Sequence, residues 1–391
     1  MCIVLLLWVA GCCTREESKA FANAAEVKRL DGSTIGGAEI DGTVTRLMSA
    51  AKVPGLGLAI LNDGRIVCLK AYGFRDVEKR RPLTQDSVMS AASFSKVAFA
   101  YMVMQLVQEG RLDLDKPVYE YLPKPLPAYR DYADLADDDR CKEITARRLL
   151  DHTAGFPNWR RFTDDRKLSI NFDPGLRFAY SGEGIDLLQL VVEKITGKGL
   201  EELMSERVFE PLGMTRSSMV WRWRFEGDLA SGYDEQQKSL GHQRRRFADA
   251  AGSMQTTPHD FAVFMQAVMQ GQGLRKETRE LMLNPQIRIF SKHEFPSLST
   301  ETTDENIGMR LSYGLGWGLY WSPYGKAFFK EGHDEGWRNY TVCFDDAKMG
   351  IMIMTNSSNG EGIYKELLET LQKNTFTPIE WEGFTPYDQR R

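Results

Sequence analysis

The feature that most constrains this chain is a run of apolar residues, 97–104, that leaves no polar side for solvent. A helix that is apolar on nearly every side must be buried inside the fold. Ser93 and Lys96 stand just before this run, and positions i and i+3 share one face of a helix. The sequence therefore predicts a central helix in which the Lys96 amine lies beneath the Ser93 hydroxyl and activates it as a nucleophile.

The same Ser-x-x-Lys spacing also occurs at Ser49 and Lys52, so spacing alone does not identify a nucleophile. Ser49 lies near the end of an amphipathic segment, 38–51, that Pro54 soon terminates. An alkoxide is disfavoured there, at the negative end of the helix dipole. Ser93 stands at the positive end of its helix, and this polarity separates the two serines.

Length, charge and residue spacing exclude several classes of function. The 391 residues, 42% of them hydrophobic, suit one large domain or two intimate ones. A net charge of -4 leaves no basic field for nucleic acid, so no nucleic-acid partner is expected. The histidines and cysteines show none of the close spacings that bind metals, so we expect no metal and no cofactor.

The first residues resemble an export signal. Residues 2–10 are apolar but too few to span a bilayer, and small residues follow them. The sequence Val-Ala-Gly-Cys at 9–12 resembles a bacterial lipobox, which implies lipidation of Cys12. We therefore expect a protein exported to the bacterial cell envelope, periplasmic and anchored by lipid. No positive charge precedes the apolar run, and a buried amino-terminal strand is the alternative.

Strand patterns at both ends of the chain predict one sheet built from distant segments. An Asp-Gly pair at 63–64 separates two apolar runs, which is a strong hairpin signal. The expected strands lie at 56–61, 65–69, 313–320, 340–344 and 350–354. The closing helix, 363–371, has an apolar face suited to lying on a sheet. We predict an α+β fold: an antiparallel sheet flanked by terminal helices and a central helix, with an inserted, mostly helical subdomain.

Several motifs follow one another in a recognisable order. They are Ser-x-x-Lys at 93–96 and the segments 149–157, 174–181, 211–215, 250–254 and 332–333. This series resembles the β-lactamase-related serine hydrolases, which include class C β-lactamases, D,D-peptidases, D-amino-acid-specific peptidases and esterases. The resemblance covers the expected catalytic domain, 38–372, and sequence patterns place a helical insertion in it at about 112–283. Outside that domain we expect an export signal over 1–12, a tether over the largely polar segment 13–37, and a C-terminal tail over 373–391.

The resemblance also implies catalytic roles. Ser93 would attack a carbonyl and form an acyl-enzyme, with Lys96 and Tyr180 acting together as the base. A neighbouring ammonium should lower the pKa of Tyr180. His333 would replace the lysine of the Lys-Thr-Gly element, as in the family's esterases and D-amino-acid peptidases.

The oxyanion hole should combine the Ser93 N–H with a second donor from the strand near Gly336. Of the tryptophans at 159, 221, 223 and 337, we expect core packing for all but Trp337, which would line the substrate site. His152 is expected to be a hydrogen-bonded structural residue.

Two departures from the family pattern bear on the substrate. Gly182 replaces the asparagine of the Tyr-x-Asn element, whose amide holds a β-lactam side chain or a peptide carbonyl. Glu335 stands where the His-x-Gly pattern has glycine. Glu183 is either a solvated loop carboxylate or a group that attracts a cation.

The leading hypothesis is therefore a serine hydrolase that forms an acyl-enzyme on esters or on D-amino-acid peptides or amides, and thus binds a small-molecule or peptide substrate. A cell-wall D,D-peptidase or weak β-lactamase is the alternative within the class. A penicillin-binding-like receptor that does not turn over is the alternative from another class, and the presence of Ser93, Lys96 and Tyr180 argues against it.

Overall fold

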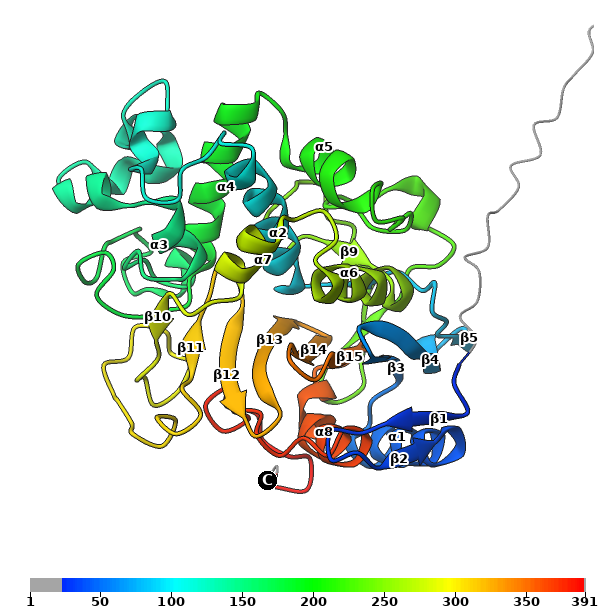
Figure 1. Cartoon of the computed structure of the whole chain (residues 1–391). Coiled ribbons are helices and arrows are strands. Elements are labelled where there is room, and N and C mark those ends of the chain that lie inside the picture. Colours follow the sequence, from blue (N-terminus) through cyan, green and yellow to red (C-terminus); the bar gives the residue numbers. More distant parts are fainter. Residues whose placement is uncertain (1–22, 390–391) are drawn as a thin grey trace, which may run out of the picture.

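The computed structural model describes residues 23–389 and is built around a nine-stranded antiparallel sheet (Figure 1). The strand order is β10-β11-β12-β13-β14-β15-β3-β4-β5. Their bounds are β3 Gly55–Asn62, β4 Arg65–Asp76, β5 Arg81–Pro82, β10 Ile287–Arg288, β11 Ser312–Tyr313, β12 Gly318–Ser322, β13 Gly325–Asp334, β14 Trp337–Phe344 and β15 Met349–Thr355. Strand β15 pairs with β3, which joins the two ends of the chain in one sheet. The predicted α+β class is confirmed.

The hairpin between β3 and β4 forms where the Asp-Gly pair predicts it. Asp63 has φ 50° and Gly64 has φ 68°, the left-handed pair that a type I′ turn requires. Every residue of β3 is buried because both faces of the sheet are covered. Leu58 belongs to the hydrophobic core on one face and Ala59 to the core on the other.

The terminal helices cover one face of the sheet. Helix α1 (Gly37–Ala51) and helix α8 (Tyr364–Leu371) lie beside each other there (Figure 1). Their apolar stripes bury Leu47 and Leu367, and a buried leucine stabilises the fold by about 1.5–3 kcal/mol. The predicted C-terminal tail also packs on this face, because Trp381 and Phe384 are buried in the same core.

The central helix α2 (Phe94–Gln108) covers the other face with α6 (Pro258–Gln270) and α7 (Lys276–Met282). Residues 97–104 are all buried, as their composition predicts. Ser49, by contrast, is exposed in the last turn of α1. Of the two Ser-x-x-Lys pairs, only the one in α2 is built into the interior.

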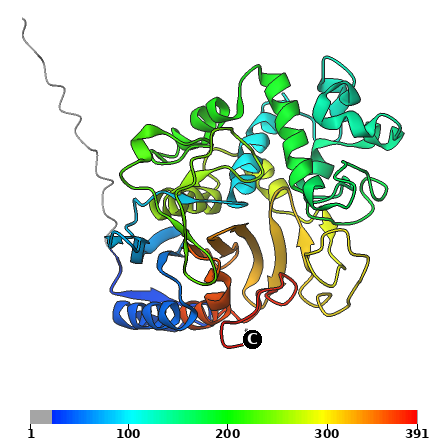
Figure 2. The same ribbon diagram turned by 180° about the vertical axis from the view of Figure 1, so that it is seen from behind.

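The region between α2 and α7 is mainly helical, as predicted, and lies on the far side of the sheet from α1 (Figure 2). Besides α6, its α-helices are α3 Ala146–Leu150, α4 Gly182–Thr196 and α5 Leu200–Met204. Its short helices are η1 Val118–Tyr121, η2 Leu126–Ala128, η3 Arg130–Leu135, η4 Asp139–Glu143, η5 Arg160–Phe162, η6 Ser205–Phe209 and η7 Trp223–Phe225, and η8 Gly360–Ile363 precedes α8. Two small sheets pair β6 (Met89–Ser90) with β9 (Gln255–Thr256) and β7 (Gly232–Tyr233) with β8 (Ser239–Gly241).

The predicted tether over 13–37 is wrong in its second half. Strands β1 (Glu26–Lys28) and β2 (Thr34–Gly36) pair antiparallel, and Val27 and Ile35 are buried in the core beneath α1. These two apolar side chains make the segment part of the fold. The export signal, Cys12 and the start of the tether lie outside the described residues. No helix within residues 23–389 has the length and apolarity needed to cross a membrane.

Candidate active site

Ser93 stands at the junction of the sheet and the central helix, where it is the N-cap of α2. The Asn339 side chain, on β14, donates hydrogen bonds to the carbonyls of Ser90 and Ala91 at 3.0 and 3.1 Å. On β13, a Cβ at Gly332 would lie 2.8 Å from the Ala91 carbonyl oxygen, so glycine allows the strand to approach this closely. These contacts fix the distance between the nucleophile and the sheet.

Lys96 lies beneath Ser93, as the helical spacing predicts. Its Nζ lies 3.1 Å from Ser93 Oγ and donates to the Ala251 carbonyl at 2.6 Å. Among the described residues, no carboxylate forms an ion pair with Lys96. Burial, followed by the positive charge of Lys330, lowers the pKa of Lys96 to about 8. The amine therefore loses its proton more readily than a free lysine and can accept the Ser93 proton.

Tyr180 lies between two lysines, with Lys96 Nζ 5.1 Å and Lys330 Nζ 4.5 Å from its ring centroid. Burial, and then the Glu331 carboxylate, raise the pKa of Tyr180 well above its usual value, while a hydrogen bond with Ser93 lowers it. The predicted lowering of this pKa is wrong, because burial outweighs the neighbouring charges. Tyr180 is thus a neutral hydroxyl that can donate a hydrogen bond.

His152 supports the Tyr180 ring from behind. The two ring centroids are 4.5 Å apart, and His152 also contacts Tyr313. The Ser181 N–H donates to His152 Nδ1 at 3.2 Å, so the ring proton is on Nε2. Burial lowers the pKa of His152 well below its usual value. This neutral, buried ring has the structural role expected of it.

Lys330 is a residue of the site that the sequence interpretation missed. It is fully buried on β13, packs on Tyr180 and pairs with the Glu331 carboxylate. Lys330, Glu331 and Gly332 form a Lys-x-Gly sequence, which matches the family's Lys-Thr-Gly element. In this match the lysine of the element is Lys330, three residues before His333. That spacing was the signal that could have identified it. Residues 330 and 333 point to opposite faces of the strand, since side chains alternate.

The His333 side chain faces the core of the terminal helices. Its ring centroid lies 5.2 Å from that of Phe384, and its Nε2 lies 3.6 Å from a Glu361 oxygen. Burial and the nearby Arg338 guanidinium lower the pKa of His333, so its ring is neutral. The ring therefore does not take the position expected for the Lys-Thr-Gly lysine.

The backbone of His333 nevertheless lines the site. A two-residue turn joins Ser322 to Gly325, and β12 covers β13 only as far as Phe329. Every second residue of β13 from Gly325 directs its N–H and C=O toward this edge. The N–H groups of Glu331 and His333 therefore face the uncovered part of the edge, and both residues line the pocket around Ser93.

Gly336 and Trp337 lie outside that pocket, contrary to the expectation. Gly336 occupies the turn between β13 and β14 with φ 79°, and its N–H donates to Ser358 Oγ at 3.0 Å. This donor is already used and cannot complete an oxyanion hole. Trp337 is 1% exposed, and its indole packs against Gly232 in the core.

The pocket around Ser93 has a volume of about 160 Å³. It is lined by Ala92, Ser93, Lys96, Asn158, Trp159, Arg161, Tyr180, Arg245, Asp249, Ala251, Gly252, Phe295, Glu331, His333 and Asp334. Arg245 forms an ion pair with Asp334 at the end of β13. No group of three His, Cys, Asp or Glu side chains within residues 23–389 is arranged to hold a metal ion.

Glu183 is neither a solvated carboxylate nor free to attract a substrate cation. It lies in the first turn of α4 and accepts hydrogen bonds from Arg160 Nη2 and Nε at 2.6 and 3.0 Å. The Arg160 backbone N–H donates to its other oxygen at 2.8 Å. This ion pair fastens the loop that contains Trp159 to the start of α4.

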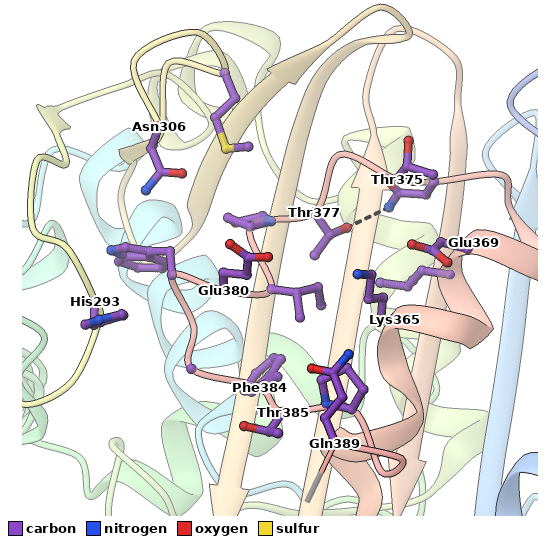
Figure 3. A pocket seen from close by; sticks show the side chains of 18 residues that line it. His293, Asn306, Lys365, Glu369, Thr375, Thr377, Glu380, Phe384, Thr385 and Gln389 are labelled. Carbon is purple, nitrogen blue, oxygen red and sulfur yellow. Dashed lines mark hydrogen bonds between the residues drawn. The ribbon is translucent and has the colours of Figure 1, made fainter. Parts of the chain in front are cut away.

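A larger pocket, of about 590 Å³, lies between α8 and the C-terminal segment (Figure 3). Lys365 and Glu369 of α8 line one side, and Glu380 and Phe384 of the C-terminal segment line another. None of its residues lines the Ser93 pocket. The group that could perform chemistry is the one around Ser93.

Comparison with known proteins agrees with this geometry. The family model described as Beta-lactamase matches residues 40–372, and the chain belongs to that family. It is 28% identical to esterase EstB of Burkholderia gladioli over 217 residues, covering 49% of this chain and 53% of that protein. It is 30% identical to a D-aminopeptidase of Brucella anthropi over 196 residues, covering 46% and 37%. It is 26% identical to protein flp of Staphylococcus aureus strain MRSA252 over 213 residues, covering 51% and 41%.

The chain thus spans about half or less of the length of these relatives. Among solved structures, it resembles an octameric penicillin-binding protein homologue from Pyrococcus abyssi with a TM-score of 0.69 and 24% identity. The alignment covers 85% of this chain and 77% of that one. The two proteins share the same fold.

Proposed function

We propose that this chain is a serine hydrolase that forms an acyl-enzyme at Ser93 on esters or on D-amino-acid peptides or amides. The observation that carries this proposal is the 3.1 Å contact between Lys96 Nζ and Ser93 Oγ in a buried site. A lysine held there without a carboxylate partner is a base that works near neutral pH. Relatives named esterase and D-aminopeptidase support this range of substrates.

The reaction begins when Lys96 takes the Ser93 proton and Ser93 Oγ attacks the carbonyl carbon. The negative charge on the carbonyl oxygen is stabilised by the N–H groups of Ser93, at the start of α2, and of His333, at the open edge of β13. Tyr180 donates a hydrogen bond to the leaving group, which departs with the proton that Lys96 took. Water then attacks the acyl-enzyme, and the acid product leaves as the Ser93 hydroxyl is restored.

One experiment separates this function from its alternatives. The purified protein and Ser93→Ala are incubated with p-nitrophenyl acetate, D-alanine p-nitroanilide, a D-alanyl-D-alanine peptide and a fluorescent penicillin. Ester or anilide turnover that Ser93→Ala abolishes supports the proposal. Turnover of the dipeptide or penicillin alone would identify a D,D-peptidase or weak β-lactamase. Stoichiometric labelling without turnover would identify a receptor, and full hydrolysis by Ser93→Ala would refute the role of Ser93.

We further infer that the protein is exported to the bacterial cell envelope and anchored through lipid on Cys12. The support is the apolar run 2–10 and the Val-Ala-Gly-Cys sequence at 9–12. Expression of the full chain in a bacterium should place it in the membrane fraction, and Cys12→Ser should release it. Membrane partition that survives this substitution would remove the lipid anchor from the proposal.

A further inference from the structure

The Trp159 indole occupies the space that a side chain at position 182, beside Tyr180, would need. Gly182 begins α4, two residues after Tyr180. A Cβ built on Gly182 would lie 2.4 Å from Cη2 and 2.5 Å from Cζ2 of the Trp159 indole. No side chain fits at 182 while Trp159 is present. The glycine in the Tyr-x-Asn position is therefore a consequence of where Trp159 lies.

The loop that carries Trp159 is fastened to α4. The Gly182 N–H donates to the Asn158 carbonyl at 3.0 Å and to Asn158 Oδ1 at 3.1 Å. On the other side of Trp159, the ion pair between Arg160 and Glu183 holds the same loop. These contacts make the indole a fixed wall of the site.

The wall faces the reacting groups. The Trp159 ring centroid lies 5.7 Å from Lys96 Nζ, and Trp159 lines the pocket that contains Ser93. The Arg161 guanidinium stacks on the same indole at 4.5 Å. On another side of the pocket, the Phe295 ring packs 5.5 Å from that of Tyr180. The space of about 160 Å³ that remains is below the ~300–1,000 Å³ of sites for drug-sized ligands.

We propose that Trp159 and Gly182 together determine specificity and restrict the site to esters with a compact acyl group. An aromatic surface stands where an asparagine amide would bind the acylamido side chain of a penicillin or an N-acylated peptide. Such a substrate loses its polar partner and meets the indole instead. This inference rests on the proposed hydrolase function and narrows its substrates.

The experiment compares Trp159→Ala, Gly182→Asn and the double variant with the native protein. Initial rates on p-nitrophenyl acetate, butyrate and octanoate give a chain-length profile, and fluorescent penicillin gives an acylation rate. The native protein should prefer acetate. Trp159→Ala should raise kcat/KM for octanoate relative to acetate at least tenfold. Gly182→Asn alone should lose folding or ester activity, and the double variant should regain both and be labelled by penicillin at least fivefold faster than Trp159→Ala.

Trp223→Ala is the matched control, because Trp223 is 77% exposed and does not line the pocket. It should leave the chain-length profile and labelling rate unchanged. Trp159→Phe keeps a smaller aromatic wall and should give an intermediate profile, which tests the inference if Trp159→Ala fails to fold. An unchanged profile in the folded Trp159 variants, or native behaviour of Gly182→Asn, would overturn it. If the native protein hydrolyses D-alanine p-nitroanilide but no ester, this inference fails and the proposed function stands. If it hydrolyses neither, the proposed function fails instead.

Discussion

Two buried lysines flank Tyr180, and their surroundings differ. Lys330 pairs with the Glu331 carboxylate, so its charge is balanced inside the protein. Lys96 contacts the neutral Ser93 hydroxyl and the Ala251 carbonyl. Burial costs a charged amine free energy, and only Lys330 recovers it from an adjacent opposite charge. The partner, and not the residue type, distinguishes the base Lys96 from Lys330, which is held in an ion pair.

The two lysines also differ in the acidic side chains that surround them. Around Lys330 lie Glu331, Glu294 and Glu382, and burial raises the pKa of Glu294 and Glu382 well above the usual range. Around Lys96 the strongest acidic influence is that of Asp249, which forms no ion pair with the amine but raises its pKa. The sheet side of the site therefore holds one ion pair beside carboxyl groups whose neutral forms burial favours, and the helical side holds one amine that can exchange a proton.

Removing the base should have the largest effect. Lys96→Met should lower kcat/KM for p-nitrophenyl acetate by about 10²–10⁴-fold, the usual contribution of a general base. Its unfolding free energy in urea should not fall, since the substitution removes an unpaired buried amine. Lys52→Met, in the exposed copy of the Ser-x-x-Lys spacing, should keep native activity. Native kcat/KM in Lys96→Met would show that Lys96 is not the general base.

Lys330→Met should act mainly on stability. It leaves the buried Glu331 carboxylate without its partner, which should lower the unfolding free energy by about 3–5 kcal/mol. Urea denaturation measures this loss. The double variant with Glu331→Met should recover most of it, because both charges are then absent. If Lys330→Met were as stable as the native protein, the ion pair between Lys330 and Glu331 would not contribute to stability.

Activity should rise with pH as Lys96 loses its proton. The kcat/KM for an ester should be half-maximal near pH 8. Stability should change in the same direction: the unfolded chain binds the Lys96 proton more tightly, so the unfolding free energy rises between about pH 8 and the free lysine pKa of about 10.4. Lys96→Met should remove this increment. An activity profile flat from pH 6 to 9 would contradict it.

Asp249→Asn should give the smallest effect. Asp249 Oδ1 accepts a hydrogen bond from the Ala251 N–H at 2.7 Å, and the Ala251 carbonyl holds Lys96. Loss of its charge should move the midpoint of the activity profile below pH 8, because Asp249 raises the pKa of Lys96. At pH values above the midpoint, kcat/KM of Asp249→Asn should be lower than that of the native protein by no more than about tenfold, because a lysine with a lower pKa is a weaker base. A midpoint that moves upward would assign Asp249 another role.

Local patterns were enough to predict part of this site. Ser93 and Lys96 lie within one helical turn, so their contact follows from spacing and from the burial of α2. The roles of Lys330 and His333 depend instead on which edge of β13 stays uncovered, and a single sequence does not reveal where β12 ends. Trp159 was expected in the core, because its contact with Gly182 depends on how a loop packs against α4.

The same holds for the fold: elements set by neighbouring residues could be predicted, and those that depend on residues distant in sequence could not. The Asp63-Gly64 hairpin and the terminal helices follow from residues close in sequence. The β1–β2 pair was missed because each strand has three residues and only one fully buried apolar side chain. The raised pKa of Tyr180 could not be predicted either, because it depends on burial and on charges from β13.

The uncovered edge of β13 also bears on solubility. A strand whose N–H and C=O groups are free on one side is a template for pairing with a second chain, which is a route to aggregation. Here the open stretch is only the end of the strand, Asp334 places a carboxylate at that end, and Arg245 binds Asp334 from a neighbouring loop. The edge that opens the site to a substrate is thus kept short, charged and partly covered. Substitutions that remove Arg245 or Asp334 should therefore make the protein self-associate more readily.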